Sequence, residues 1–156
     1  MTPPRIALSL GLLALALILG ALSFQYIGHM PPCEMCHWQR WPLFAAIAVG
    51  VFSGTLVRRD DNAATALAVL AILLVAASGA IGVYQAGAEW HWWQGPQACT
   101  GTRVVFHSLT DLNTPGQARC DLPSFRLFGL SLAGWNALID FGAAIAASVM
   151  LLRRRA

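Results

Sequence analysis

The residues best suited to chemistry in this chain are its four cysteines, two of which form a Cys-x-x-Cys motif, Cys33-Glu34-Met35-Cys36. The other two, Cys99 and Cys120, have 20 residues between them. A Cys-x-x-Cys disulfide closes so short a loop that it restricts the unfolded chain little and adds little stability. The same spacing is typical of thiol redox centres. We interpret the motif as a redox pair, and for Cys99 and Cys120 a purely structural disulfide stays open as an alternative.

Arg40 follows Cys36 by four residues, which is about one turn if a helix starts near the motif. A permanent positive charge at that distance favours the thiolate and lowers the pKa of the thiol from its ordinary value of about 8.5. Cys36 would then be a nucleophile or an electron donor. An interfacial anchor that binds lipid headgroups is the alternative role for Arg40, and the two roles are compatible.

The same residues fit two other chemistries. With His37 the motif reads Cys-x-x-Cys-His, the attachment signature of c-type haem. Haem would use both thiols and His37, and it would leave Cys99, Cys120 and Arg40 without a role. The four cysteines also match the ligand count of a zinc site, but only one spacing is typical of a zinc knuckle, and we predict no metal. A membrane-anchored haem electron carrier and a disulfide-stapled structural protein stay open as alternatives.

The composition indicates a membrane protein. Of the 156 residues, 57% are hydrophobic and only 11% are charged, against about 25% charged residues in ordinary soluble domains. The mean hydropathy is +0.60. All ten basic residues are arginines, and they lie mostly in linkers rather than on one surface. We therefore expect membrane lipid around the chain and no nucleic acid as a partner.

Four apolar segments predict an all-α membrane protein, a four-helix transmembrane bundle that forms a single domain over residues 1–156. About twenty residues at 1.5 Å each cross the hydrocarbon core, and three of the segments are long enough. The second is short, so its flanks must anchor or snorkel at the interfaces, and we place Pro42 in its first helical turn. The predicted spans are residues 6–27, 42–57, 63–87 and 129–152.

The distribution of arginines predicts the orientation. Six arginines fall on the side of the termini and four on the other, three of those four in one long loop where charge orients less strongly. We therefore expect both termini in the cytoplasm and the loops at residues 25–41 and 88–128 outside. A cleaved signal peptide is not expected, because the first apolar stretch exceeds the about 7 to 15 residues of a signal core.

Both cysteine pairs then lie in an oxidising environment, in which disulfides persist. Four cysteines allow three pairings, and the sequence alone does not choose among them. Neighbours in the same loop are the expected pairs, Cys33 with Cys36 and Cys99 with Cys120. The second loop is far longer than a connection between two helices requires, which favours a functional loop.

Polar and small residues inside the spans predict how the helices pack. Asp140 lies within the fourth span, where an ionisable group suggests function by default, but we expect it to make a polar contact between helices rather than a proton path. Small residues let helices approach closely in membranes. Those we assign this role are Gly11, Ala14, Ala45, Ala46, Ala76, Ala77, Gly79, Gly82, Ala143 and Ala144.

The segment Pro32-Cys33-x-x-Cys36-x-x-Gln39-Arg40-Trp41 resembles the disulfide bond formation protein B (DsbB) family. The resemblance runs along nearly the whole chain and implies four spans in the bacterial inner membrane with both outer loops in the periplasm. Further matches are Glu89-Trp90, Gly95-Pro96 before Cys99, Cys120-Asp121, and Phe128-Gly129-Leu130-Ser131 before Trp135-Asn136.

The resemblance implies a quinone-dependent protein-disulfide oxidoreductase. Such a protein re-oxidises a periplasmic thioredoxin-fold thiol oxidase, a DsbA-like partner, and passes the electrons to membrane quinone, ubiquinone or menaquinone. The family's pattern implies that Cys99 forms a mixed disulfide with the partner and that Cys120 then attacks Cys33. Cys36 would emerge as a thiolate beside Arg40 and the quinone, so these two are the expected quinone-binding residues. Glu34 departs from the pattern and could change the redox potential.

Overall fold

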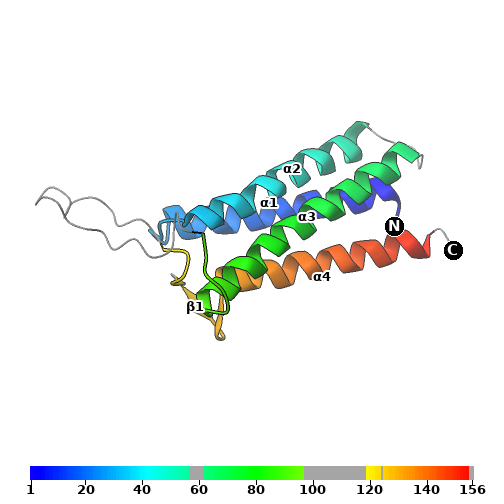
Figure 1. Ribbon diagram of the computed structural model, residues 1–156. Coiled ribbons are helices and arrows are strands. Elements are labelled where there is room, and N and C mark those ends of the chain that lie inside the picture. The colour runs from blue at the N-terminus through cyan, green and yellow to red at the C-terminus, as the bar shows by residue number, and fades with distance from the viewer. Residues whose placement is uncertain (57–61, 97–118, 124, 155–156) are drawn as a thin grey trace, which may run out of the picture.

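The computed structural model describes residues 1–56, 62–96, 119–123 and 125–154. Within these residues the chain forms four long helices and one short hairpin. The helices run alongside one another, with both termini at one end of the bundle and the hairpin at the other (Figure 1). The elements are α1 (Pro3–Tyr26), α2 (Glu34–Leu56), α3 (Asn62–Glu89), β1 (Arg126–Leu127), β2 (Leu130–Ser131) and α4 (Leu132–Arg153).

Each predicted span falls on a helix, so the mostly helical architecture is confirmed. Among the described residues, α1, α3 and α4 are long and apolar enough to cross a membrane. Helix α2 is not in this group because its first two turns are polar and include Glu34, His37 and Arg40. The arrangement of four spans therefore stays a prediction.

Helix α2 begins at Glu34, eight residues before Pro42. The placement of Pro42 in the first turn was wrong, because this proline lies inside the helix. A proline lacks an N–H and interrupts one backbone hydrogen bond, but long helices of membrane proteins tolerate it. Glu34 in the first turn also suits the positive end of the helix dipole. As a result, one continuous helix carries Cys36 and Arg40 on successive turns.

A hairpin that the sequence analysis did not predict precedes α4. Arg126 pairs with Ser131 and Leu127 with Leu130 in an antiparallel register. The turn residues Phe128 and Gly129 have φ values of +51° and +84°, and positive values at both positions are typical of a two-residue type I′ turn. The helix therefore starts three residues later than the predicted span, at Leu132.

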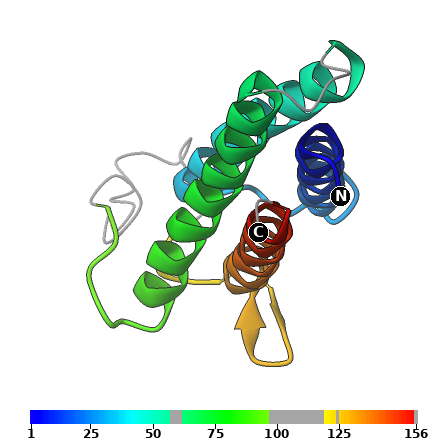
Figure 2. The same cartoon turned by 90° about the vertical axis from the view of Figure 1, so that its right-hand side faces the viewer.

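The helices pack through small residues and turn large ones outward, as expected for a protein surrounded by lipid. Helix α1 packs against α2 and α3, and α4 packs mainly against α3; Figure 2 views them from the end that carries both termini. Fully buried alanines include Ala7, Ala14, Ala46, Ala68 and Ala71, while more than half of Leu12, Leu19, Leu73 and Ile145 is exposed. Of the small residues selected from the sequence, Ala45 and Ala77 face outward.

Helices α1 and α2 approach each other closely at Gly11 and Gly50. A Cβ added to Gly50 would lie 2.7 Å from the carbonyl oxygen of Ala7 and 2.8 Å from the Cα of Gly11. Both atoms are backbone, so they cannot turn away. We expect Gly50→Ala to push the helices apart and to cost about 1–3 kcal/mol of stability, measured as a lower melting temperature in detergent. Gly20→Ala is the matched control, because a Cβ there meets nothing within 4 Å; equal effects would contradict this packing.

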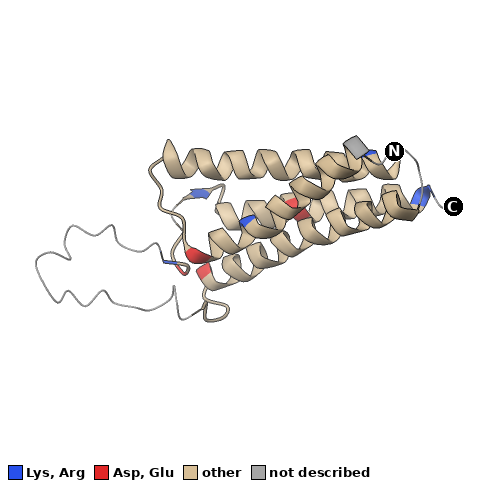
Figure 3. Cartoon of the chain, turned by 90° about the horizontal axis from the view of Figure 1, so that it is seen from above, with Lys and Arg blue, Asp and Glu red and all other residues tan. Residues whose placement is uncertain are grey.

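The helices carry long stretches without charged residues (Figure 3), and Asp140 is a fully buried exception. The Nδ2 of Asn136 donates to Oδ2 of Asp140 at 3.0 Å and to Oγ of Ser78 on α3 at 3.1 Å. These three side chains form a polar cluster between α3 and α4. The geometry is that of the interhelical contact expected from the sequence.

Candidate redox site around Cys33 and Cys36

The Cys-x-x-Cys motif lies at the first turn of α2. Cys33 immediately precedes the helix, and its Sγ accepts a hydrogen bond from the backbone N–H of Cys36 at 3.2 Å. The first N–H groups of a helix have no partner within it, so a sulfur at this position caps the helix. Cys33 is buried, whereas Cys36 is partly accessible. The fold therefore gives the two sulfurs different surroundings although only two residues separate them.

Both cysteines of the motif are free thiols in the structure. The sequence analysis expected a disulfide between them, and the structure instead has the reduced form. A redox pair alternates between these two states, so the bridge between Cys33 and Cys36 stays a prediction.

The surroundings favour the thiolate form of Cys36. A hydrogen bond from the Cys33 side chain is the main cause that lowers the pKa of Cys36 to about 6, against burial, which raises it. A hydrogen bond from Gln85 and the positive charge of Arg40 lower it further. The pKa of Cys33 is raised, chiefly because its thiol is the donor in that shared hydrogen bond. The effect expected of Arg40 is present, but it is smaller than the effects of Cys33 and Gln85.

Gln85 on α3 lies against both sulfurs, and the sequence analysis did not select it. Its Nε2 is 3.4 Å from Sγ of Cys33, 3.6 Å from Sγ of Cys36 and 3.3 Å from Oε1 of Glu89. Its Oε1 accepts a hydrogen bond from Nε2 of Gln39 at 3.2 Å. The sequence contains a pattern that could have identified Gln85, because Gln85 and Glu89 are polar residues one helical turn apart in an apolar segment.

A cavity of about 300 Å³ lies beside the motif, between α1 and α4. Its polar lining includes Cys36 and Arg40, so the structure brings together the two residues expected to bind a cofactor. Nη1 of Arg40 donates to Oε1 of Gln25 on α1 at 2.8 Å, which fixes the guanidinium at the cavity wall. The volume is at the lower end of the range for small-molecule sites. The apolar lining includes Leu17, Gly20, Ala21, Phe24, Leu132, Ala133 and Ile139.

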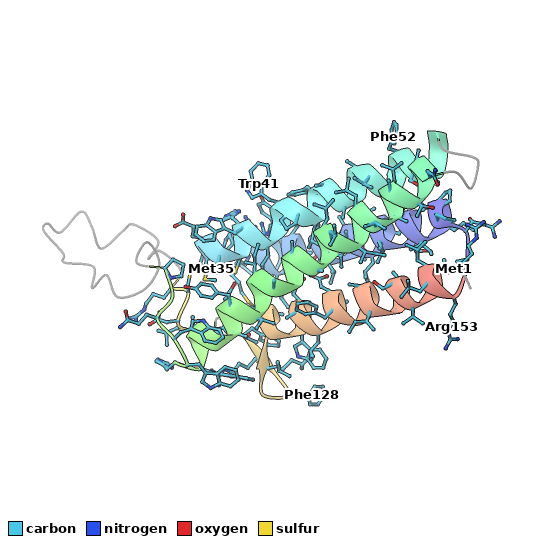
Figure 4. The ribbon with its side chains drawn as sticks, turned by 45° about the vertical axis from the view of Figure 1, so that its right-hand side comes forward. Met1, Met35, Trp41, Phe52, Phe128 and Arg153 are labelled. Atoms are coloured by element: carbon cyan, nitrogen blue, oxygen red, sulfur yellow. The ribbon has the colours of Figure 1, made fainter. Side chains whose placement is uncertain are left out.

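Cys120, from the segment before the hairpin, packs against the motif. It is fully buried and forms one cluster with Cys33 and Met35, against which Cys36 also packs. Figure 4 shows Met35 at the end of the bundle that carries the hairpin. The side chain of Trp41 projects outward from the bundle in the same view. Two residues distant in sequence, Cys33 and Cys120, therefore meet in the fold.

The redox state of Cys120 differs from that of the motif. Cys120 is disulfide-bonded, and its partner is neither Cys33 nor Cys36, because both are free thiols. Cys99 lies outside the described residues, and so does the predicted bridge between Cys99 and Cys120. The site thus combines a dithiol with a disulfide-bonded sulfur beside it.

Comparison with known proteins identifies the family. A family model described as disulfide bond formation protein DsbB matches residues 3–150. The chain belongs to the DsbB family. Among curated members of the DsbB family, disulfide bond formation protein B of Burkholderia thailandensis is 33% identical over 160 residues, which cover 97% of this chain and 90% of the relative. The protein of the same name from Burkholderia pseudomallei is 31% identical with the same coverage. The resemblance found from the cysteine motif is confirmed.

More distant DsbB relatives also match nearly the whole chain. Disulfide bond formation protein B of Cupriavidus metallidurans is 27% identical over 155 residues, which cover 94% of this chain and 91% of the relative. No solved structure gives a significant match. The DsbB assignment therefore rests on sequence, and the geometry described above is that of this chain alone.

Proposed function

We propose that this chain is a quinone-dependent thiol oxidase of the bacterial inner membrane that re-oxidises a periplasmic thioredoxin-fold, DsbA-like dithiol oxidase. The observation that carries the proposal is the packing of the disulfide-bonded Cys120 against the free thiol of Cys33. Thiol–disulfide exchange needs a thiolate and a disulfide sulfur in contact. The printed names of the relatives, disulfide bond formation protein B, support the same chemistry and favour it over a haem carrier.

The proposed relay begins on the long loop. A thiolate of the reduced partner attacks Cys99, the bond between Cys99 and Cys120 breaks, and the partner is joined to Cys99 by a mixed disulfide. Cys120, released as a thiolate, attacks Cys33, and Cys36 leaves as a thiolate. The low pKa of Cys36 makes it a good leaving group, since a sulfur of lower pKa leaves faster.

Two further exchanges complete the transfer. The second thiolate of the partner displaces Cys99, which oxidises the partner. The freed Cys99 thiolate attacks Cys120 and releases Cys33, so the loop disulfide is restored and the two electrons rest on Cys33 and Cys36. The disulfide of Cys120 beside the free thiols of Cys33 and Cys36 is compatible with this state of the relay. Oxidation of the motif back to its disulfide releases two electrons and two protons.

The cavity beside Cys36 fits the electron acceptor. A quinone, when bound, takes up the two electrons and two protons and becomes a quinol. The apolar walls formed by α1 and α4 suit a flat apolar ring. The guanidinium of Arg40, held by Gln25, presents fixed N–H donors that suit a carbonyl oxygen. Cys36 lines the same cavity and is the motif sulfur with the lower pKa.

The membrane arrangement follows from the packing of α2. We infer that α2 spans together with its neighbours, because it packs along α1 and α3, both apolar enough to cross a membrane. Its 23 residues extend over about 34 Å, so its polar first turns can lie at the interface while the rest crosses the hydrocarbon core. The termini then share the cytoplasmic side, and the cysteine motif lies at the periplasmic end. Figure 1 supports a common side for both termini, and the excess of arginines on that side favours the cytoplasm.

The test is electron transfer by the purified chain in detergent. We expect it to reduce a soluble ubiquinone analogue, followed by the change in quinone absorbance, only when a reduced DsbA-like oxidase is added. One quinone should be reduced for each donor dithiol oxidised. The oxidised donor is the control and should give no reaction. Absence of quinone reduction with the reduced donor would overturn the proposal, and a Soret band in the visible spectrum would favour the haem carrier instead.

A further inference from the structure

We propose that Gln85 is a positioning residue that holds both sulfurs of the Cys-x-x-Cys motif from α3 and stabilises the thiolate form of Cys36. The Gln85 side chain is buried, at 5% exposure, so water does not compete for its hydrogen bonds. It is also the polar group through which α3 contacts Cys33 and Cys36. This role rests on the proposed function for its purpose, because the thiolate is the form that reacts.

The neighbours of Gln85 determine which end of its carboxamide faces the sulfurs. Gln39 donates through its Nε2 to Oε1 of Gln85, and Oε1 of Glu89 accepts from Nε2 of Gln85. A reversed amide would place two N–H groups opposite each other at Gln39 and two oxygens opposite each other at Glu89. The carboxylate of Glu89 therefore selects the orientation, because it accepts hydrogen bonds, and the amide of Gln39 is consistent with it. In that orientation Nε2 of Gln85 directs one hydrogen toward Glu89 and the other toward Cys33 and Cys36.

The carboxamide can serve both protonation states of Cys36. As a thiol, Cys36 can donate to Oε1 of Gln85, which is 3.9 Å from its Sγ. As a thiolate, it accepts from Nε2 at 3.6 Å. An amide offers a donor and an acceptor without a charge of its own, so it adds no repulsion when the sulfur becomes negative. Cys36 can thus gain or lose its proton without a rearrangement of α3.

The charged groups around the motif explain why a neutral donor is needed there. Arg40 on α2 acts on Cys36 with a favourable charge, and Arg119 lines the same cavity. Glu89 on α3 opposes negative charge on the motif. Gln85 uses one amide hydrogen on Glu89 and directs the other toward the sulfurs. It therefore provides a hydrogen bond to the thiolate on a helix face whose nearest ionisable group is acidic.

The experiment titrates Cys36 in the reduced, full-length protein, without partner or quinone. The rate of alkylation by iodoacetamide is measured against pH, and mass spectrometry resolves the peptide that carries Cys36. In the unmodified protein the rate should rise through a midpoint at about pH 6, because the thiolate forms above this pKa and the unreactive thiol persists below it. Gln85→Leu should move the midpoint up by about one unit and slow alkylation at pH 6 about fivefold.

Two variants separate this role from a general effect on folding. Gln39→Leu removes the hydrogen bond that Oε1 of Gln85 accepts, so Gln85 is held less firmly and the midpoint should shift in the same direction by less. Ser78→Ala is the matched control on α3, because Ser78 contacts Asn136 rather than the cysteines, and it should leave the midpoint unchanged. If Gln85→Leu does not fold, Gln85→Asn keeps an amide but draws it back from the sulfurs, and it should raise the midpoint as well.

An unchanged midpoint in a folded Gln85 variant would overturn the inference, as would an equal shift in Ser78→Ala. Because the titration needs neither quinone nor partner, it stays readable if the unmodified protein fails to reduce quinone. Failure of the proposed function and failure of the role of Gln85 are therefore distinguishable.

Discussion

Replacement of Cys36 by serine is expected to abolish donor-dependent quinone reduction while the fold and the disulfide of Cys120 are kept. Cys36 is the motif sulfur that lines the cavity, and its pKa is lowered to about 6. A serine hydroxyl is not ionised near neutral pH and cannot form a disulfide with Cys33. The rate of quinone reduction should therefore fall about a thousandfold or more, as for other residues that react directly.

The Cys36→Ser protein needs controls that exclude simple misfolding. The hydroxyl is slightly smaller than the thiol and the site is only partly buried, so the melting temperature should stay close to that of the unmodified protein. Under denaturing, non-reducing conditions Cys120 should still be protected from alkylation, because its disulfide does not involve Cys36. Turnover above a tenth of the original rate would contradict the proposed electron path.

Cys33→Ser should also stop turnover, but at a different step. Cys33 is buried against Cys120, and it is the proposed target of the Cys120 thiolate. Cys36 remains in this variant as a free thiol, so alkylation of the reduced protein should still label Cys36. The two variants thus have similar activities and different alkylation profiles.

The parts of the fold that were predicted correctly depend on long apolar segments. Stretches of about twenty apolar residues signal helices of that length without regard to tertiary contacts. The start of α2 was missed because a proline suggests a first turn, whereas Pro42 lies inside a helix that begins at Glu34. The hairpin was missed because each strand has only two residues, too few for a pattern of alternation.

The proximity of the candidate residues could be predicted where they are close in sequence. Cys36 and Arg40 share the cavity because they lie one helical turn apart, which spacing alone can indicate. Gln85 comes from another helix, about fifty residues away. Periodicity can show that Gln85 and Glu89 share a face, but it cannot show which helix that face meets. The contact of Cys120 with Cys33 was implied only by the family's chemistry, because a long loop has no periodic pattern from which the position of Cys120 could be predicted.

A larger side chain in the cavity is expected to weaken quinone binding without stopping thiol exchange. Ala21 on α1 is half-buried and lines the cavity. In Ala21→Phe the ring would occupy space that the proposed quinone needs, in a cavity of only about 300 Å³. Loss of part of the apolar contact should raise the KM for the quinone analogue about tenfold or more. The measurement is the dependence of the initial rate on quinone concentration at saturating donor.

Leu19→Phe is the matched control for this variant. Leu19 lies two residues earlier on the same helix, is 55% exposed and is not part of the cavity wall, so the same aromatic ring there should face lipid and leave the KM unchanged. In both variants, formation of the mixed disulfide with the donor should proceed at the original rate, because that reaction takes place at the loop cysteines. An unchanged KM in Ala21→Phe would place the quinone elsewhere. Slower formation of the mixed disulfide in Ala21→Phe would instead mean that the substitution in α1 also disturbs the loop cysteines. Quinone binding in the cavity and thiol exchange at the loop would then not be independent steps.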